Sequence, residues 1–232
     1  IMTSDPRLIP DARVIPSLSY LEVMELSFFG AKVMHPRSIE PAMKKNIIVR
    51  VKNTFNPSHP GTAIVRGEKR DSRVVKALTY IDKVALINIC GAQMIGRPGV
   101  AKAIFSALAE NEVNVMMISQ GSSEANISLI IDESQLTIAT EALASIVKEG
   151  LVREVTSNRD VCAVAVVGSG MAGAKGTGGR IFTALGNGGV NVMMISQGSS
   201  EVNISFVVKQ ADGPKAVRIL HDEFRLSEED YA

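Results

Sequence analysis

The feature that most constrains the fold of this chain is an internal repeat. Residues 113–124 recur letter for letter as residues 190–201, which gives an offset of 77 residues. The same offset pairs Gly99 with Gly176. An identity of this length does not arise by chance, so the chain carries two copies of one supersecondary unit.

Each copy has the apolar periodicity of a small α/β unit. The elements predicted for the first copy are, in order, a strand at 84–90, a helix near 100–108, strands at 114–120 and 126–131, a helix near 134–148 and a strand at 152–156. The order strand, helix, strand, strand, helix, strand is the ferredoxin-like βαββαβ arrangement. We therefore expect an α/β (α+β) fold with two such modules in tandem.

The phase of the repeat leaves the second copy without a closing strand. Its last predicted helix lies near 213–224, and residues 225–232 are too charged for a convincing strand. Residues 74–80 have the matching strand sequence but precede the first copy, so we expect the first copy to be inserted in the second. The predicted domains are 1–66, a segment outside the repeat; 82–158, the first module; and 73–81 with 159–226, the second module.

Composition favours a small ligand. The 25 Lys and Arg residues nearly balance the 24 Asp and Glu residues, so no overall charge argues for nucleic acid or an anionic membrane as a partner. Cys90 and Cys162 lie in apolar runs, typical of buried thiols in a reducing cytosol, and no Cys/His spacing predicts a metal site. No apolar stretch approaches the length of a membrane span, so we expect a cytoplasmic protein.

Residues 1–61 have different chemistry from the repeat. Ser19 and Glu22 fit the capping box of a helix over about 19–26, and residues 47–52 alternate as a strand. The chain enters in the middle of a motif at Ile1, without the polar residues common at free termini, which suggests a fragment.

Two basic residues of this segment could hold a phosphate. Arg7 could bind it bidentately and Lys32 as a point charge. Because no glycine-rich loop precedes them, spacing alone favours ordinary solvated side chains. On the same terms His35, before Pro36, is more typical of a structural histidine than of a catalyst.

These segments carry a family resemblance. Residues 2–7, 29–37 and 49–57 resemble the end of the amino-acid-kinase domain of aspartate kinases, and the two repeats resemble the two ACT domains of that family. The resemblance implies transfer of the γ-phosphoryl group of ATP, used with Mg as a substrate, to L-aspartate, which gives 4-phospho-L-aspartate and ADP. It implies no tightly bound cofactor. The family's Lys-Phe-Gly-Gly-Thr-Ser segment and aspartate-binding residues are missing here, so we expect no catalytic residues and no activity from this chain alone.

The resemblance also implies nucleotide contacts in the first segment. Carried over to this sequence, they are Met2, Arg7, Lys32 and Val33. The resemblance, and not the spacing, favours nucleotide contacts over solvated cations for Arg7 and Lys32.

An ACT pair is expected to bind a free amino acid. Such a zwitterion needs N–H groups at a helix N-terminus for its carboxylate and carbonyl oxygens or an acid for its ammonium. The loop 96–101 supplies a helix N-terminus, the strand from Asn114 supplies carbonyls, and Gln120 can both donate to and accept from a hydroxyl. With the positions that contact effectors in related aspartate kinases, the predicted effector-binding residues are Gly96, Arg97, Pro98, Gly99, Val100, Ala101, Asn114, Val115, Met116, Ile118, Gln120, Asn191, Val192, Ile195 and Gln197.

Charge favours threonine over lysine as the effector. The loops 91–99 and 168–179 contain no Asp or Glu that could balance the distal ammonium of lysine. The 118–124 pattern also resembles threonine-sensitive members of the family. Glu124 and Glu201 would weaken this argument if they reached a site, but residues 122–124 are more typical of a plain hairpin turn.

One motif matches a nucleotide-binding pattern but lacks the sequence context that such a site requires. Residues 168–173 match a dinucleotide fingerprint after a predicted strand, but the first copy lacks the middle glycine and no acidic residue ends a second strand about 20 residues on. Asn126 and Asn203 are expected to make hydrogen bonds at a sheet edge or between modules, and the Met116-Met117 pair is more typical of core filler than of a ligand.

The sequence therefore predicts the regulatory part of an aspartate kinase that senses threonine and forms a homodimer or higher homo-oligomer through its ACT domains. An alternative is a stand-alone regulatory or assembly subunit that dimerises through these modules and has no catalytic role. A third, weaker reading is an amino-acid-responsive binding protein without a kinase partner. ATP protection of Lys32 from chemical modification would count against that reading.

Overall fold

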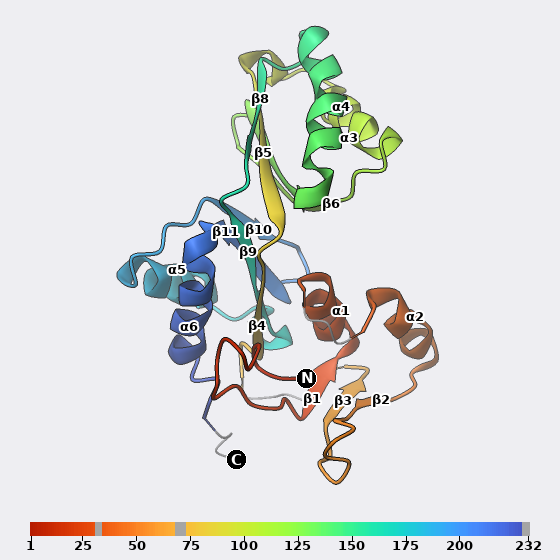
Figure 1. The fold of residues 1–232 in the computed structure, drawn as a ribbon, viewed down its shortest axis with the longest axis vertical. Helices are drawn as coiled ribbons and strands as arrows, with labels where there is room; N and C mark the ends of the chain where they lie inside the picture. The colour runs from red at the N-terminus through yellow and green to blue at the C-terminus, as the bar shows by residue number, and fades with distance from the viewer. Residues whose placement is uncertain (31–33, 68–72, 229–232) are drawn as a thin grey trace.

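The computed structural model describes residues 1–30, 34–67 and 73–228. Figure 1 shows the first module at one end of the molecule and the second module beside the N-terminal segment at the other. Each module has its own four-stranded sheet, and the N-terminal segment has a three-stranded one.

The N-terminal segment contains β1 (Ser17–Ser19), α1 (Tyr20–Phe28), α2 (Pro36–Lys45), β2 (Val49–Val51) and β3 (Thr62–Val65), with strand order β1-β3-β2. The predicted capping box is confirmed. The Ser19 hydroxyl accepts from the Glu22 N–H at 3.2 Å, and the Glu22 carboxylate accepts from the Ser19 N–H at 2.7 Å. His35 caps α2, because its Nδ1 accepts from the Arg37 N–H, so this histidine has a structural role.

The first module has the predicted element order. It runs β5 (Val84–Cys90), η1 (Ala92–Met94), α3 (Val100–Glu110), β6 (Val115–Gln120), β7 (Asn126–Asp132), η2 (Glu133–Gln135), α4 (Leu136–Lys148) and β8 (Glu154–Asn158). The strands lie in the antiparallel order β6-β7-β5-β8. Both helices cover one face of this sheet (Figure 1), so the ferredoxin-like prediction is confirmed.

The second module takes its fourth strand from before the first. It comprises β4 (Ala77–Ile81), β9 (Cys162–Val167), η3 (Ser169–Met171), α5 (Thr177–Asn187), β10 (Met194–Gln197), β11 (Asn203–Val208), η4 (Gln210–Asp212) and α6 (Gly213–Glu223). The strand order is β10-β11-β9-β4, and β4 pairs antiparallel with β9. The predicted insertion of one copy in the other is confirmed, and residues 225–228 form no strand.

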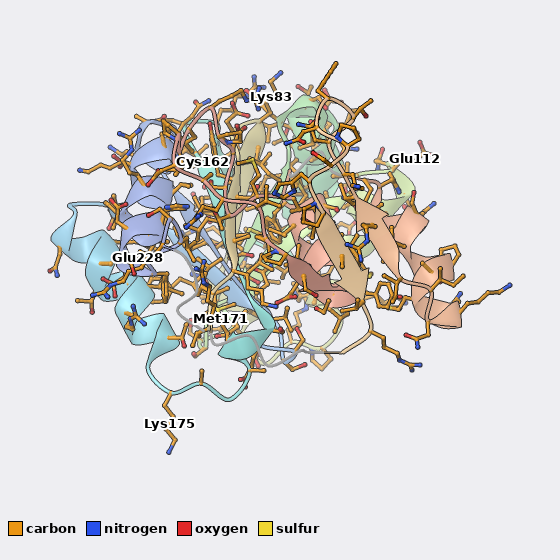
Figure 2. The ribbon with its side chains drawn as sticks, turned by 90° about the horizontal axis from the view of Figure 1, so that it is seen from below. Lys83, Glu112, Cys162, Met171, Lys175 and Glu228 are labelled. Carbon is orange, nitrogen blue, oxygen red and sulfur yellow. The ribbon has the colours of Figure 1, made fainter. Side chains whose placement is uncertain are left out.

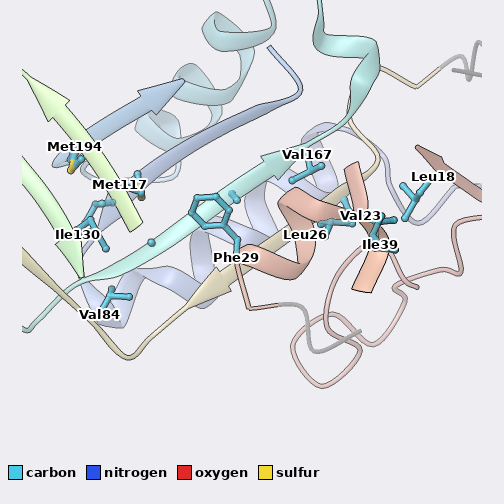
Figure 3. Close-up of a cluster of buried hydrophobic side chains, with 14 of the residues drawn as sticks. Leu18, Val23, Leu26, Phe29, Ile39, Val84, Met117, Ile130, Val167 and Met194 are labelled. Carbon is cyan, nitrogen blue, oxygen red and sulfur yellow. The ribbon is translucent and has the colours of Figure 1, made fainter. Parts of the chain in front are cut away.

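Strand β9 shows where the core lies. All of its residues are buried, because the second sheet is covered on both faces. Cys162, Val164 and Val166 face α5 and α6, whereas Ala163 and Ala165 face α1. The α1 side continues through Phe29 to Met117 of the first module and Met194 of the second (Figure 3).

Two details differ from the sequence-based predictions. The closing strands begin at Ala77 and Glu154 rather than at 74 and 152, because the preceding residues pass over the ends of β9 and β5, where the Arg153 N–H donates to the Cys90 carbonyl at 2.8 Å. Cys90 is half-buried rather than buried, while Cys162 is buried and desolvation raises its pKa to about 12.

Among the described residues, no helix is both long and apolar enough to cross a membrane.

Candidate effector-binding site

The start of α3 has the backbone features of an anion-binding helix N-terminus. Gly99 is the residue before the helix and adopts a left-handed conformation with φ of 92°, which a glycine reaches without strain. No side chain within the described ranges caps this helix. The first-turn N–H groups therefore point into the loop with the positive end of the helix dipole.

A cavity of about 350 Å³ opens beside this helix start. Seven predicted effector residues line it, and Met94, Glu124 and Ile127 complete the wall: the seven are Gly96, Arg97, Pro98, Gly99, Val100, Ala101 and Gln120. The loop and the end of β6 are thus brought together around one space of the size that a small ligand needs.

Glu124 lies on the wall of this cavity. Its carboxylate reaches from the β6–β7 turn and accepts a hydrogen bond from the Gly96 N–H at 2.9 Å. The second copy repeats the contact, since the Glu201 carboxylate accepts from the Gly173 N–H at 2.6 Å. Residues 121–124 form the predicted turn, and the Glu124 side chain also reaches the cavity, which is the case that weakens the charge argument for threonine. The letter-for-letter recurrence of the glutamate was the signal that could have found it.

The other predicted residues of the first module lie elsewhere. The Asn114 N–H donates to the Gln135 side chain, and Val115 packs on the α3–α4 side of the sheet. Met116 lines a different cavity, against α1, and the Ile118 carbonyl accepts from the Ser196 hydroxyl of the second module at 3.2 Å. At about 3.3 Å per residue, Asn114 lies roughly 20 Å along the strand from Gln120, so one small ligand in this cavity cannot touch both.

The second module has an equivalent loop. Gly176 precedes α5 with φ of 84°, as Gly99 precedes α3. Gln197 ends β10 and is exposed, Ile195 is 45% exposed, and Asn191 and Val192 lie just before that strand. The side chain of Lys175, in the loop itself, points away from the molecule (Figure 2).

Two of the predicted nucleotide contacts share a separate cavity of about 470 Å³. Met2 and Arg7 line it together with Tyr80 of β4. The Arg7 guanidinium pairs with the Asp5 carboxylate at 2.6 Å, and this hydrogen bond lowers the pKa of Asp5. Lys32 and Val33 lie outside the described residues.

The apparent dinucleotide fingerprint has a packing explanation. A Cβ on Gly168 would lie 2.4 Å from the Val74 carbonyl oxygen, and one on Gly170 would lie 2.6 Å from that of Arg73. These glycines therefore admit the chain segment that leads into β4. Asn203 is on an inner strand and donates to Glu25 of α1 at 2.8 Å, so its contact is with the N-terminal segment rather than with a sheet edge or the other module.

Comparisons with known proteins agree with this architecture. Residues 87–146 and 164–224 match the ACT domain, and residues 1–53 match the amino acid kinase family. A bifunctional aspartokinase/homoserine dehydrogenase of Haemophilus influenzae is 42% identical over 225 residues, which are 95% of this chain and 28% of that protein.

Solved structures show the same arrangement. The crystal structure of Clostridium acetobutylicum aspartate kinase matches 96% of this chain and 52% of that chain, with a TM-score of 0.88 and 32% identity. E. coli aspartokinase III in complex with lysine and aspartate matches 97% of this chain and 49% of that chain, with a TM-score of 0.81 and 27% identity. The chain thus spans about half the length of these enzymes. It belongs to the ACT domain family, as an amino acid kinase segment followed by the two ACT domains of an aspartokinase regulatory region.

Proposed function

We propose that this chain is the regulatory part of an enzyme that phosphorylates L-aspartate with ATP, and that its ACT domains bind L-threonine as a feedback inhibitor. The observation that carries the proposal is the cavity at the start of α3, where an uncapped helix N-terminus faces Gln120. Met2, Arg7, Lys32 and Val33 would contact the nucleotide in the complete enzyme.

Each polar group of threonine has a complement in this cavity. The carboxylate suits the N–H groups at the start of α3, because these N–H groups carry the positive end of the helix dipole. The hydroxyl suits the Gln120 amide, which can donate and accept. The ammonium suits the Glu124 carboxylate on the cavity wall.

Glu124 changes the argument about lysine. A carboxylate on the wall supplies the counter-charge that the loop sequence lacks, and the E. coli relative was solved with lysine bound. The preference for threonine therefore depends on Gln120, which matches a hydroxyl better than an extended ammonium.

Calorimetric titration of this chain with threonine, lysine and methionine tests the proposal. We expect saturable binding of threonine, and weaker or undetectable binding of the other two. Binding of lysine but not threonine would overturn the choice of effector. Binding of none would overturn the assignment of the cavity.

The predicted residues at the start of β6 fit a site completed by a second copy. Asn114 to Met116 lie too far from Gln120 to share a ligand within one chain. A homodimer formed through the ACT domains would place them near the loop of the partner. Analytical ultracentrifugation with and without threonine tests this arrangement, and a monomer in both states would exclude it.

Inhibition follows by linkage if threonine binds more tightly to a less active conformation of the kinase. The test is aspartate phosphorylation by the complete enzyme over a range of threonine concentrations. An unchanged rate at saturating threonine would show that binding is not coupled to catalysis.

A further inference from the structure

A buried carboxylate joins the N-terminal segment to the second module. Glu22 of α1 is fully buried, and its Oε1 accepts from both the N–H and the hydroxyl of Ser169, each at 2.8 Å. Its Oε2 accepts from the Ser19 N–H, and the Lys76 ammonium lies 3.2 Å from Oε1. Three separate stretches of chain thus meet at one side chain.

These contacts keep Glu22 ionised although it is buried. Desolvation opposes the charge, but the N–H groups of Ser169 and Ser19, the Lys76 ammonium and the Ser169 hydroxyl together lower the pKa of Glu22. A buried charge is costly unless its partners stay in place. The position of Ser169 is therefore tied to that of α1.

The two repeats differ where this contact is made. Ser169 and Gly170 take the places of Ala92 and Gln93 in the first copy. Ser169 supplies the hydroxyl to Glu22, and Gly170 leaves room for the Arg73 backbone. The equivalent loop of the first copy, which has neither change, follows the end of β5 at the far end of the molecule from α1 (Figure 1).

Ser169 belongs to the same loop as the second module's helix start. Hydrogen bonds join it to the next residues, because the Ala172 N–H donates to the Ser169 carbonyl at 3.2 Å and the Ala174 N–H to the Met171 carbonyl at 2.9 Å. Met171 is buried in the core of the module. A displacement at Gly173 to Gly176 would therefore reach Ser169 through a short, packed turn.

We propose that Glu22 is the junction through which the state of the second module's loop is transmitted to α1 of the kinase segment. The identity of the ligand that moves the loop rests on the proposed function, whereas the coupling of Glu22 to the loop does not. Glu22 acts in this role as a positioning residue, since it touches no cavity ligand.

Hydrogen exchange of the whole chain without ligand tests the coupling. In Glu22→Gln we expect the amides of residues 168–176 to exchange about five-fold faster or more, in line with usual coupling strengths. The amides of residues 91–99, the equivalent loop, should be unchanged. Ser169→Ala, which restores the residue of the first copy, should give a smaller acceleration in the same place. Glu40→Gln, at an exposed position of α2, should leave both loops unchanged.

The outcomes separate coupling from simple destabilisation. Equal acceleration of both loops, or of neither, in Glu22→Gln and Ser169→Ala would overturn the proposal. The experiment is then repeated with threonine: saturating threonine should alter the exchange of residues 20–28 in the unmodified chain and in Glu40→Gln, but not in Glu22→Gln. An equal response in all three would also overturn it. If calorimetry detects no threonine binding, the proposed effector fails while the ligand-free comparison still decides the role of Glu22.

Discussion

At the residue scale, the proposed preference for a hydroxyl rests on the two glutamines that end β6 and β10. Gln120 lines the cavity beside α3, and Gln197 holds the equivalent position in the second module. Gln120→Ala or Gln197→Ala should weaken threonine binding by about 1–3 kcal/mol if the substitution leaves the buried hydroxyl of the bound threonine unpaired. Calorimetry measures the change, with Gln210→Ala, an exposed glutamine, as the control. Unchanged affinity in both variants would remove these residues from the site.

His221 makes stability depend on pH. Its ring is buried in α6, where Nε2 contacts the Thr3 hydroxyl at 3.0 Å. Burial lowers its pKa and the charge of Arg73 acts in the same direction, against the opposing effects of Asp11 and Asp222. The unfolded chain therefore binds the proton more readily than the folded one. The contribution of neutral His221 to the free energy of unfolding should be complete above the pKa of an unfolded histidine, about 6.5. It should decrease as the pH falls below this value.

Urea denaturation at pH 7 and pH 5 measures this loss. His221→Gln cannot take up the proton, so it should lose less stability than the unmodified chain between these two values. His59→Gln, at an exposed position, serves as the control and should behave like the unmodified chain. Equal losses in all three chains would mean that His221 does not determine the acid sensitivity.

At the scale of single elements, two glycines at the start of α5 have different conformations and should respond differently to substitution. Gly176 has φ of 84°, whereas Gly178 lies inside the helix, and neither would meet another atom if a Cβ were added. Gly176→Ala should destabilise the chain by about 1–2 kcal/mol through the left-handed conformation alone. Gly178→Ala should stabilise it by about 0.5–1 kcal/mol, because alanine loses less entropy in a helix. Chemical denaturation of both variants measures the pair, and shifts of the same sign would contradict this account.

The elements also show how far the sequence could predict the structure. The order of strands and helices followed from periodicity, and the origin of β4 followed from the 77-residue phase, because both depend on local pattern and repetition. The docking of α1 was not predictable in this way. Ala163 and Ala165 replace Leu86 and Asn88 of the first copy where α1 approaches β9, but only the structure shows which element fills that space.

Part of the candidate site was also predictable from the local pattern. Residues 96–101 and Gln120 converge because a loop before a helix and the end of a neighbouring strand meet in this fold. Asn114 was grouped with them, although it lies at the opposite end of the same strand. The reach of Glu124 depends on a turn in which this residue has φ of 55°, a conformation that its sequence does not signal.

At the scale of the whole molecule, the first module is an insertion in a hairpin. Strands β4 and β9 pair with Ile81 opposite Ala163, so Asp82 and Cys162 stand where a tight turn would begin. Replacing residues 83–161 with Asn-Gly, a favoured two-residue turn, should leave the second module folded on the N-terminal segment. Cooperative unfolding and exchange protection of β9 would report this.

A variant that lacks β4 instead of the first module provides the comparison. Removing residues 73–81 takes away β4 and leaves β9 as an unpaired edge, so this variant should lose cooperative unfolding or aggregate. If the excised chain fails while this variant folds, the modules are not organised as a hairpin with an insertion.

The same pairing has a consequence for biosynthesis. Strand β4 leaves the ribosome before the first module, but β9 follows it by roughly 80 residues, about 4–16 s at 5–20 residues per second. The first module contains all four of its own strands and can close during that interval. The second module must wait for β9 and then for α6, so the part of the protein encoded in the middle is expected to be native before the part that surrounds it.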